Sequence, residues 1–194
     1  MSKLAVLLAA VALVVVGCGG DDDDEQAAGD QQTVGSRQAP FDRAFIDAMV
    51  PHHRAAIEMA EAAKARGLTQ PDLDKIASDI IVSQQREIDQ MLGWREQWFG
   101  SRKLGPIQPE VLGVPENELG MEHGSGDEIA GAVDVDATFA EMMIPHHDGA
   151  IAMAEAANER AQRDEIKDLA AAIIGAQERE IKIMEKHASG EHHG

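Results

Sequence analysis

A segment that occurs twice, 94 residues apart, constrains the fold of this 194-residue chain more than any other feature. Residues 45–63 read FIDAMVPHHRAAIEMAEAA and residues 139–157 read FAEMMIPHHDGAIAMAEAA, with 12 of 19 positions identical. The match resumes after a slip of one residue, where QQREI at 84–88 aligns with QEREI at 177–181. Such a duplication predicts one structural unit that is used twice and packs against its own copy.

Each unit is expected to form a hairpin of two helices, because its apolar residues recur at helical spacing. In the first unit, Gly67 is a carboxy-terminal cap signal, and Pro71 suits the opening turn of the next helix. The second unit repeats the pattern of apolar residues. The four expected helices cover about residues 41–65, 71–99, 135–160 and 163–188.

The two units, at about 41–99 and 135–188, are joined by a stretch rich in Gly and Pro. This composition predicts an irregular crossover over residues 100–134. One hairpin alone cannot bury its apolar side, whereas two hairpins share one core. We therefore predict an all-α four-helix bundle over residues 41–188, followed by a flexible tail at 189–194.

The amino terminus predicts export and lipidation. A short apolar run in residues 1–17 ends in Val-Val-Gly-Cys, which resembles the lipobox of bacterial lipoproteins, so Cys18 is the expected lipid-bearing residue. The alternative is an uncleaved anchor with a buried cysteine. Residues 18–40 are acidic and poor in apolar side chains, which predicts a solvated tether. The bundle is thus expected at the extracytoplasmic face of a membrane, held there by the lipid.

Charge and cysteine content exclude other classes of protein. A formal net charge of -18 argues against binding to nucleic-acid backbones, which requires clustered Lys and Arg. The single cysteine excludes a disulfide within the chain.

Histidines fall on the apolar side of the first helix in each unit. With about 100° between successive residues, His52 lies within the apolar stripe and His53 on its shoulder, whereas Arg54 and Glu58 point away. Pro51 precedes the pair and predicts a kink or a fresh helix start. The second unit repeats the arrangement with Pro145, His146, His147, Met143 and Met153.

The second helix of each unit also carries polar residues in its apolar stripe. Gln84 lies at the centre of that stripe, with Glu87 beside it, and would lose roughly 1–3 kcal/mol if it found no hydrogen-bond partner. His187 stands three residues past Met184, where the first unit has Trp94, so the two halves are not expected to be equivalent in function. The recurring residues of the second unit are Gln177, Glu180 and Met184.

Imidazole and thioether groups together favour copper, particularly Cu(I), over Mg²⁺ or Ca²⁺. Gln84 and Gln177 are expected to orient ligands by hydrogen bonds rather than bind metal. The structural alternative is that the methionines fill the core and the histidines form a satisfied polar network. The candidate ligands are His52, His53, Met49, Met59, His146, His147, Met143, Met153, Glu87, Glu180, Met91, Met184 and His187.

The motifs MVPHHRAAIEMAEAA and MIPHHDGAIAMAEAA, each followed by Q-x-x-E-I-x-x-M, resemble the domain-of-unknown-function family 305. The resemblance covers nearly all of the expected bundle. It implies a ferritin-like helical fold, secretion or lipid anchoring, and a link to copper binding and tolerance.

Three classes of function follow. The preferred one is a non-enzymatic copper-binding or copper-sequestering protein of the envelope, with a homodimer or a copper-handling protein as candidate partner. A ferritin-like metal oxidase is disfavoured because no Glu has a His three residues later. The alternative to metal binding is a helical envelope interaction or stress protein whose His pairs are structural.

Overall fold

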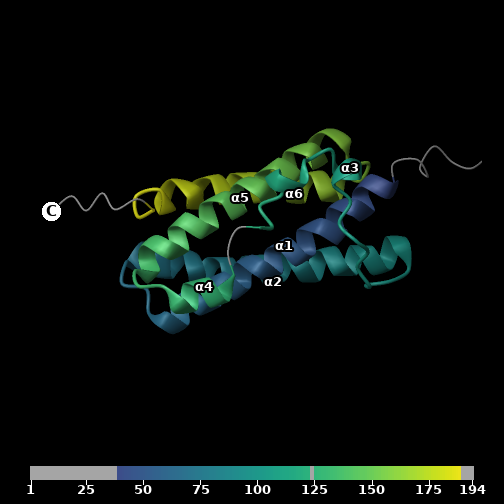
Figure 1. Cartoon of the computed structure of the whole chain (residues 1–194). Helices are drawn as coiled ribbons and strands as arrows, with labels where there is room; N and C mark the ends of the chain where they lie inside the picture. Colours follow the sequence, from purple (N-terminus) through teal and green to yellow (C-terminus); the bar gives the residue numbers. More distant parts are fainter. Residues whose placement is uncertain (1–38, 123–124, 189–194) are drawn as a thin grey trace, which may run out of the picture. The chain divides into compact units, whose positions relative to one another are not determined.

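The computed structural model describes residues 39–122 and 125–188, and the expected all-α bundle is confirmed there. Two long hairpins, α1–α2 and α5–α6, pack together through α1 and α5, and the described residues include no strand (Figure 1). Three short elements lie between the hairpins. The long helices are α1 (Ala39–Arg66), α2 (Pro71–Phe99), α5 (Val135–Arg160) and α6 (Asp164–Met184), and the short elements are α3 (Pro109–Leu112), η2 (Glu116–Glu118) and α4 (Gly126–Gly131).

Local signals set most helix ends where the sequence predicts them. Gly67, at φ 90°, donates its N–H to the carbonyls of Ala63 and Lys64 and closes α1. Pro71 opens α2, as expected. The last helix is shorter than predicted, because α6 ends at Met184 and not near residue 188. At this end the hydrogen bonds change to the shorter spacing of a 3₁₀ turn. The N–H of His187 donates to the carbonyl of Met184, three residues back, at 2.8 Å.

The two prolines within the long helices do not interrupt them. The sequence predicts a kink or a fresh start at Pro51 and at Pro145. In the structure, α1 and α5 each continue through the proline as one helix, so the expected fresh start is wrong. Packing on both sides of each proline holds the helix together, since residues 49, 50, 52 and 53 of α1 and residues 143, 146 and 147 of α5 are buried.

The crossover is more regular than predicted. It contains α3, η2 and α4 rather than irregular chain alone. Ser125 and Glu128 form a capping box at the start of α4, and this short-range signal gives the segment its helix. Leu112, Leu119 and Ile129 are buried and anchor the crossover to the bundle.

Reciprocal capping at the two ends of the bundle shows that α1 and α5 run antiparallel. Near the start of α1, the buried Asp42 accepts hydrogen bonds from the backbone of Gln162 and from Arg163, in the turn between α5 and α6. Near the start of α5, Asp136 accepts a hydrogen bond from the backbone N–H of Thr69, in the turn between α1 and α2. The start of each first helix therefore lies beside the far end of the other.

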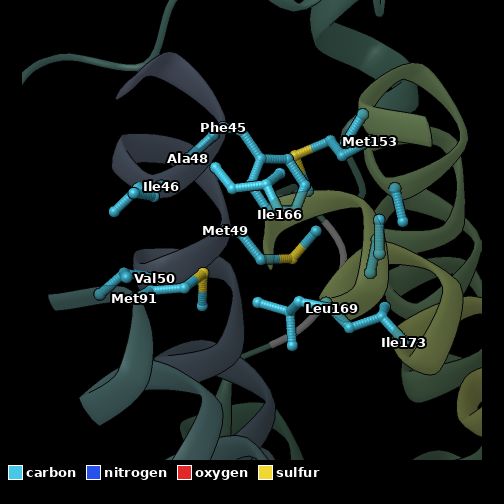
Figure 2. Packing of buried hydrophobic residues seen from close by; sticks show 14 of the residues in the cluster. Phe45, Ile46, Ala48, Met49, Val50, Met91, Met153, Ile166, Leu169 and Ile173 are labelled. Atoms are coloured by element: carbon cyan, nitrogen blue, oxygen red, sulfur yellow. The ribbon is translucent and has the colours of Figure 1, made fainter. Parts of the chain in front are cut away.

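The apolar core consists of two clusters, and each contains side chains from both hairpins. One combines Phe45 and Met49 of α1 with Met153 of α5 and with α6 residues, as Figure 2 shows. The other combines Met59 of α1 with Phe139 of α5 and with side chains of α2 and α6. Along α1 and α5 the boundary between the clusters falls at the histidine pairs.

Candidate metal centre

Four buried histidines meet where α1 and α5 pack together. The exposed fractions of His52, His53 and His147 are 0%, and that of His146 is 2%. The rings of His52 and His146, one from each hairpin, have centroids 3.7 Å apart and planes inclined by 37°. The duplication therefore brings equivalent residues of the two units into direct contact, and these four side chains are called the histidine centre below.

Each outer histidine is tied to a carboxylate on the second helix of its own hairpin. His53 Nε2 lies 2.7 Å from Glu87 Oε2, and His147 Nε2 lies 2.7 Å from Glu180 Oε2. A carboxylate bonded to one ring nitrogen fixes the orientation of the imidazole and raises the basicity of the other nitrogen. The sequence predicted these glutamates either as ligands or as groups that orient histidine, and the hydrogen bonds agree with the second role.

Several buried polar atoms of this region have no hydrogen-bond partner among the described residues. They include both ring nitrogens of His52 and the Nδ1 atoms of His53 and His147. The side-chain oxygens of Gln84 and Gln177 belong to the same set. Leaving such an atom unsatisfied costs about 1–3 kcal/mol, so a buried group of this kind calls for a water molecule or an ion. The donor set of neutral imidazole nitrogens fits a copper or zinc ion better than a hard cation.

The electrostatic surroundings keep His52 neutral. Burial lowers the pKa of His52 well below 6.5, and the neighbouring imidazoles of His146, His53 and His147 lower it further. The backbone of Leu119 lies close enough to His52 to act in the opposite direction, although neither ring nitrogen forms a hydrogen bond of normal geometry. A neutral imidazole is the form that binds metal, so His52 has a lone pair available without loss of a proton near neutral pH.

The candidate methionines are fully buried in the apolar clusters on either side of the histidine centre. Figure 2 shows Met49, Met91 and Met153 among Phe45, Ile166 and other core side chains. Met59, Met143 and Met184 belong to the other cluster. The methionines thus contribute to packing in this structure, and each cluster places thioethers from both hairpins near the boundary that the histidines occupy.

His187 lies apart from the histidine centre. Its Nε2 is 3.1 Å from a carboxylate oxygen of Asp72, in the first turn of α2. Burial alone would raise the pKa of Asp72, but the hydrogen bond and charge of His187, with backbone donors, hold it below its usual value. In the described ranges, moreover, no three His, Cys, Asp or Glu side chains are arranged to hold a metal ion. The described geometry therefore brings histidines together in pairs rather than as a closed coordination shell.

The crossover closes the histidine centre, which the sequence did not predict. An ideal Cβ on Gly149 would lie 2.3 Å from the carbonyl oxygen of Leu119, and one on Gly120 would lie 2.8 Å from the carbonyl oxygen of Pro145. Backbone of the crossover thus lies directly on α5 at the His pair, where an ideal Cβ on Gly120 would also lie 3.0 Å from the carbonyl oxygen of His146. One sequence signal was available, since Gly149 stands where the first unit has Ala55.

The sequence also did not predict a buried ion pair near the histidine centre. Arg95 donates from Nε to Asp47 Oδ1 at 2.5 Å and from Nη1 to the carbonyl of Ser101 at 2.6 Å. Both side chains are almost fully buried. Asp47 has Glu141 as its equivalent in the second unit, and that residue is exposed, so the ion pair distinguishes the two halves. The predicted signal peptide, the predicted lipid site Cys18, most of the predicted tether and the predicted tail lie outside the described residues.

A family model described as Domain of unknown function (DUF305) matches residues 25–95 and residues 42–188 of this chain. Among curated proteins, the uncharacterized protein L153 of Acanthamoeba polyphaga mimivirus is 40% identical over 50 residues, which is 26% of this chain. That match spans 32% of the viral protein, about a third of its length.

Solved structures give longer matches. CopM in its Cu(II)-bound form is 37% identical, with a TM-score of 0.63, and the match covers 76% of this chain and 95% of CopM. The Cu(I)-bound form of CopM gives 36% identity and a TM-score of 0.60, over 75% and 93% of the two chains. A DUF305 fragment from Deinococcus radiodurans is 30% identical, with a TM-score of 0.62, over 76% and 94%.

Proposed function

This chain belongs to the DUF305 family, and on that premise we propose that it is an extracytoplasmic protein that binds copper at the histidine centre. One observation carries the proposal. Buried imidazoles from both hairpins meet in the core, and three of them have ring nitrogens without a hydrogen-bond partner among the described residues. The Cu(I)-bound and Cu(II)-bound structures of the similar protein CopM support copper as the metal.

In the proposed site, the inner pair, His52 and His146, supplies imidazole nitrogen ligands. His53 and His147 present their Nδ1 atoms, while Glu87 and Glu180 hold them through Nε2. Thioethers of the adjoining clusters complete the ligand set after side-chain rotation, because Cu(I) accepts sulfur readily. We propose that this site binds metal without catalysing a reaction.

Copper titration tests the proposal. The metal-free mature chain is titrated with Cu(I) and with Cu(II) in competition with a chromophoric chelator. We expect binding that is lost in the variant with His52, His53, His146 and His147 all changed to Ala. His187→Ala is the matched control, since His187 bonds Asp72 outside the centre, and it should bind as the parent does. Equal affinity in the parent and the quadruple variant would contradict the proposal and favour a metal-free helical bundle with structural histidines.

A second variant keeps the packing intact. Glu87→Gln with Glu180→Gln replaces the two carboxylates that face His53 and His147. Loss of such partners typically weakens metal affinity by about 10–100-fold, and we expect a loss in that range. Circular dichroism of each variant separates lost binding from lost folding.

We further propose that lipid on Cys18 anchors the protein to a membrane at its extracytoplasmic face. The lipobox-like sequence before Cys18 supports this. Intact mass measurement of protein from the envelope should give a chain that starts at Cys18 and carries a diacylglycerol adduct. A chain that still starts at Met1, or a Cys18→Ser variant that fractionates like the parent, contradicts it.

A further inference from the structure

One end of the bundle carries aromatic side chains that have no counterpart in the second hairpin and that pack, partly buried, against the core. Helix α2 has 29 residues and α6 has 21, so α2 extends about two turns beyond the repeated pattern. The extension carries both tryptophans of the chain, Trp94 and Trp98, together with Phe99. The position equivalent to Trp94 is His187, and α6 ends before the positions equivalent to Trp98 and Phe99.

These aromatic rings form a layered cluster at the surface. The rings of Trp94 and Trp98 stack with centroids 5.2 Å apart and planes inclined by 12°. The guanidinium of Arg163 lies 4.4 Å from the centroid of Trp98 and 5.5 Å from that of Phe99. All three rings remain partly exposed, whereas Phe45 and Phe139 are fully buried.

Two more cationic side chains follow the same rings in the sequence. Arg102 and Lys103 follow Phe99 closely in sequence, and both are exposed. Glu96 lies 3.6 Å from Arg102 and offsets part of its charge. The name aromatic end is used below for Trp94, Trp98, Phe99, Arg102, Lys103 and Arg163.

The aromatic end lies where α1 begins. Arg163, which covers Trp98, also pairs with Asp42 of the first turn of α1 at 2.7 Å. Figure 1 shows the start of α1, the end of α2 and the turn between α5 and α6 on the same side. The chain from the expected lipid site at Cys18 therefore enters the bundle at this end.

We propose that the aromatic end rests on the phospholipid surface of the membrane to which the protein is anchored. Indole rings favour the headgroup level of a bilayer, and flexible Arg and Lys side chains reach lipid phosphates from there. The chain's net charge of -18 does not oppose this contact strongly, because charges farther than about 8 Å are screened at physiological salt. The proposal rests on the proposed lipid anchoring, which supplies a high effective concentration and makes a weak surface contact sufficient.

The two tryptophans provide the test, because they are the only tryptophans in the chain. The full lipidated chain is reconstituted in phosphatidylglycerol–phosphatidylcholine vesicles, with or without lipids brominated near the headgroup. We expect a blue shift of Trp emission relative to the unlipidated Cys18→Ser chain without vesicles, and quenching by the brominated lipids. Arg102→Glu with Lys103→Glu should reduce the quenching.

The matched control has the same change in charge at the opposite end of the bundle. Lys182→Glu with Lys186→Glu alters two exposed lysines near the end of α6, and it should leave the quenching unchanged. Absence of quenching in the anchored parent chain, or equal loss in the two double variants, would overturn the proposal. Copper titration of the same samples tests the proposed metal site separately from the membrane contact, because quenching by brominated lipids does not depend on copper binding. Mass analysis shows whether the lipid is present.

Discussion

At the scale of single residues, burial sets the charge of the groups that matter most. His52 has no exposed surface, and burial together with three neighbouring imidazoles lowers its pKa well below 6.5. Asp47 and Arg95 are buried as well, and there each side chain is the ion-pair partner of the other. His52 is therefore neutral because it is buried beside other imidazoles, whereas Asp47 and Arg95 are buried as partners of opposite charge.

The lowered pKa of His52 makes the stability of the metal-free protein depend on pH. In the unfolded chain the imidazole takes up a proton at about pH 6.5, whereas in the folded chain it does so only at lower pH. The contribution of neutral His52 to the free energy of unfolding is therefore complete above about pH 6.5. It is lost as the pH falls toward the pKa of His52 in the folded chain. Urea unfolding of parent and His52→Gln between about pH 5 and 7.5 measures this, and the variant should show a weaker dependence on pH. Identical slopes for the two proteins would contradict it.

Removal of one partner from the buried ion pair should be costly. Asp47→Asn leaves the charge of Arg95 without its carboxylate, and we expect the free energy of unfolding to fall by about 3–5 kcal/mol. Glu141→Gln is the control, since Glu141 occupies the equivalent position in the second unit and is exposed. That change should stay within about 0.5 kcal/mol in denaturant unfolding. Similar losses in the two variants would show that the pair contributes nothing specific.

At the scale of elements, the close approach between the crossover and α5 determines how the histidine centre is covered. The carbonyl of Leu119 occupies the place that a side chain on Gly149 would fill. Leu119 itself has an exposed fraction of only 1%. Glycine in a helix lowers stability by its flexibility, but at position 149 it leaves the space into which the backbone of Leu119 packs.

Gly149→Ala should therefore destabilise the protein by about 1–3 kcal/mol, because a Cβ cannot fit beside Leu119. We expect Gly93→Ala in α2 to stabilise the protein instead, since no atom lies within 4 Å of the added Cβ. Better helix propensity should stabilise that variant by about 0.5–1 kcal/mol. Thermal and denaturant unfolding measure both changes. If Gly149→Ala is as stable as the parent or more stable, the close approach at Gly149 is wrong.

At the scale of the whole molecule, the core belongs to neither hairpin alone. Each of the two apolar clusters combines side chains from α1 with side chains from α5. The histidine centre shares this property, because its inner pair takes one ring from each hairpin. Folding and the proposed metal binding therefore both depend on association of the two units.

A chain limited to residues 39–99, the first hairpin, should lack a cooperative thermal transition as a monomer. The hairpin would expose the apolar sides of α1 and α2 that normally face α5 and α6. Circular dichroism with sedimentation analysis measures helix content and mass together, and residues 39–188 serve as the reference. Cooperative unfolding of a monomeric hairpin would contradict this expectation.

Much of the architecture was predictable because its signals are local. The spacing of apolar residues, Gly67 and Pro71 located the long helices, and the duplication predicted two equivalent hairpins. The helical phase of His52 predicted its burial, whereas His53, predicted at the shoulder of the apolar stripe, is fully buried as well. The shortened α6 and the helices of the crossover were not predicted, because competing short-range hydrogen bonds decide them.

The sequence by itself determined which residues face the core and that the core contains two copies of one pattern, because helical phase depends only on positions along the chain. The tertiary structure alone decided that His52 meets His146, that each outer histidine bonds a glutamate, and that Leu119 covers Gly149. The physical reason is that contacts between distant segments depend on how the helices are placed side by side. That placement arises from the packing of the whole core, not from the residues of any one helix.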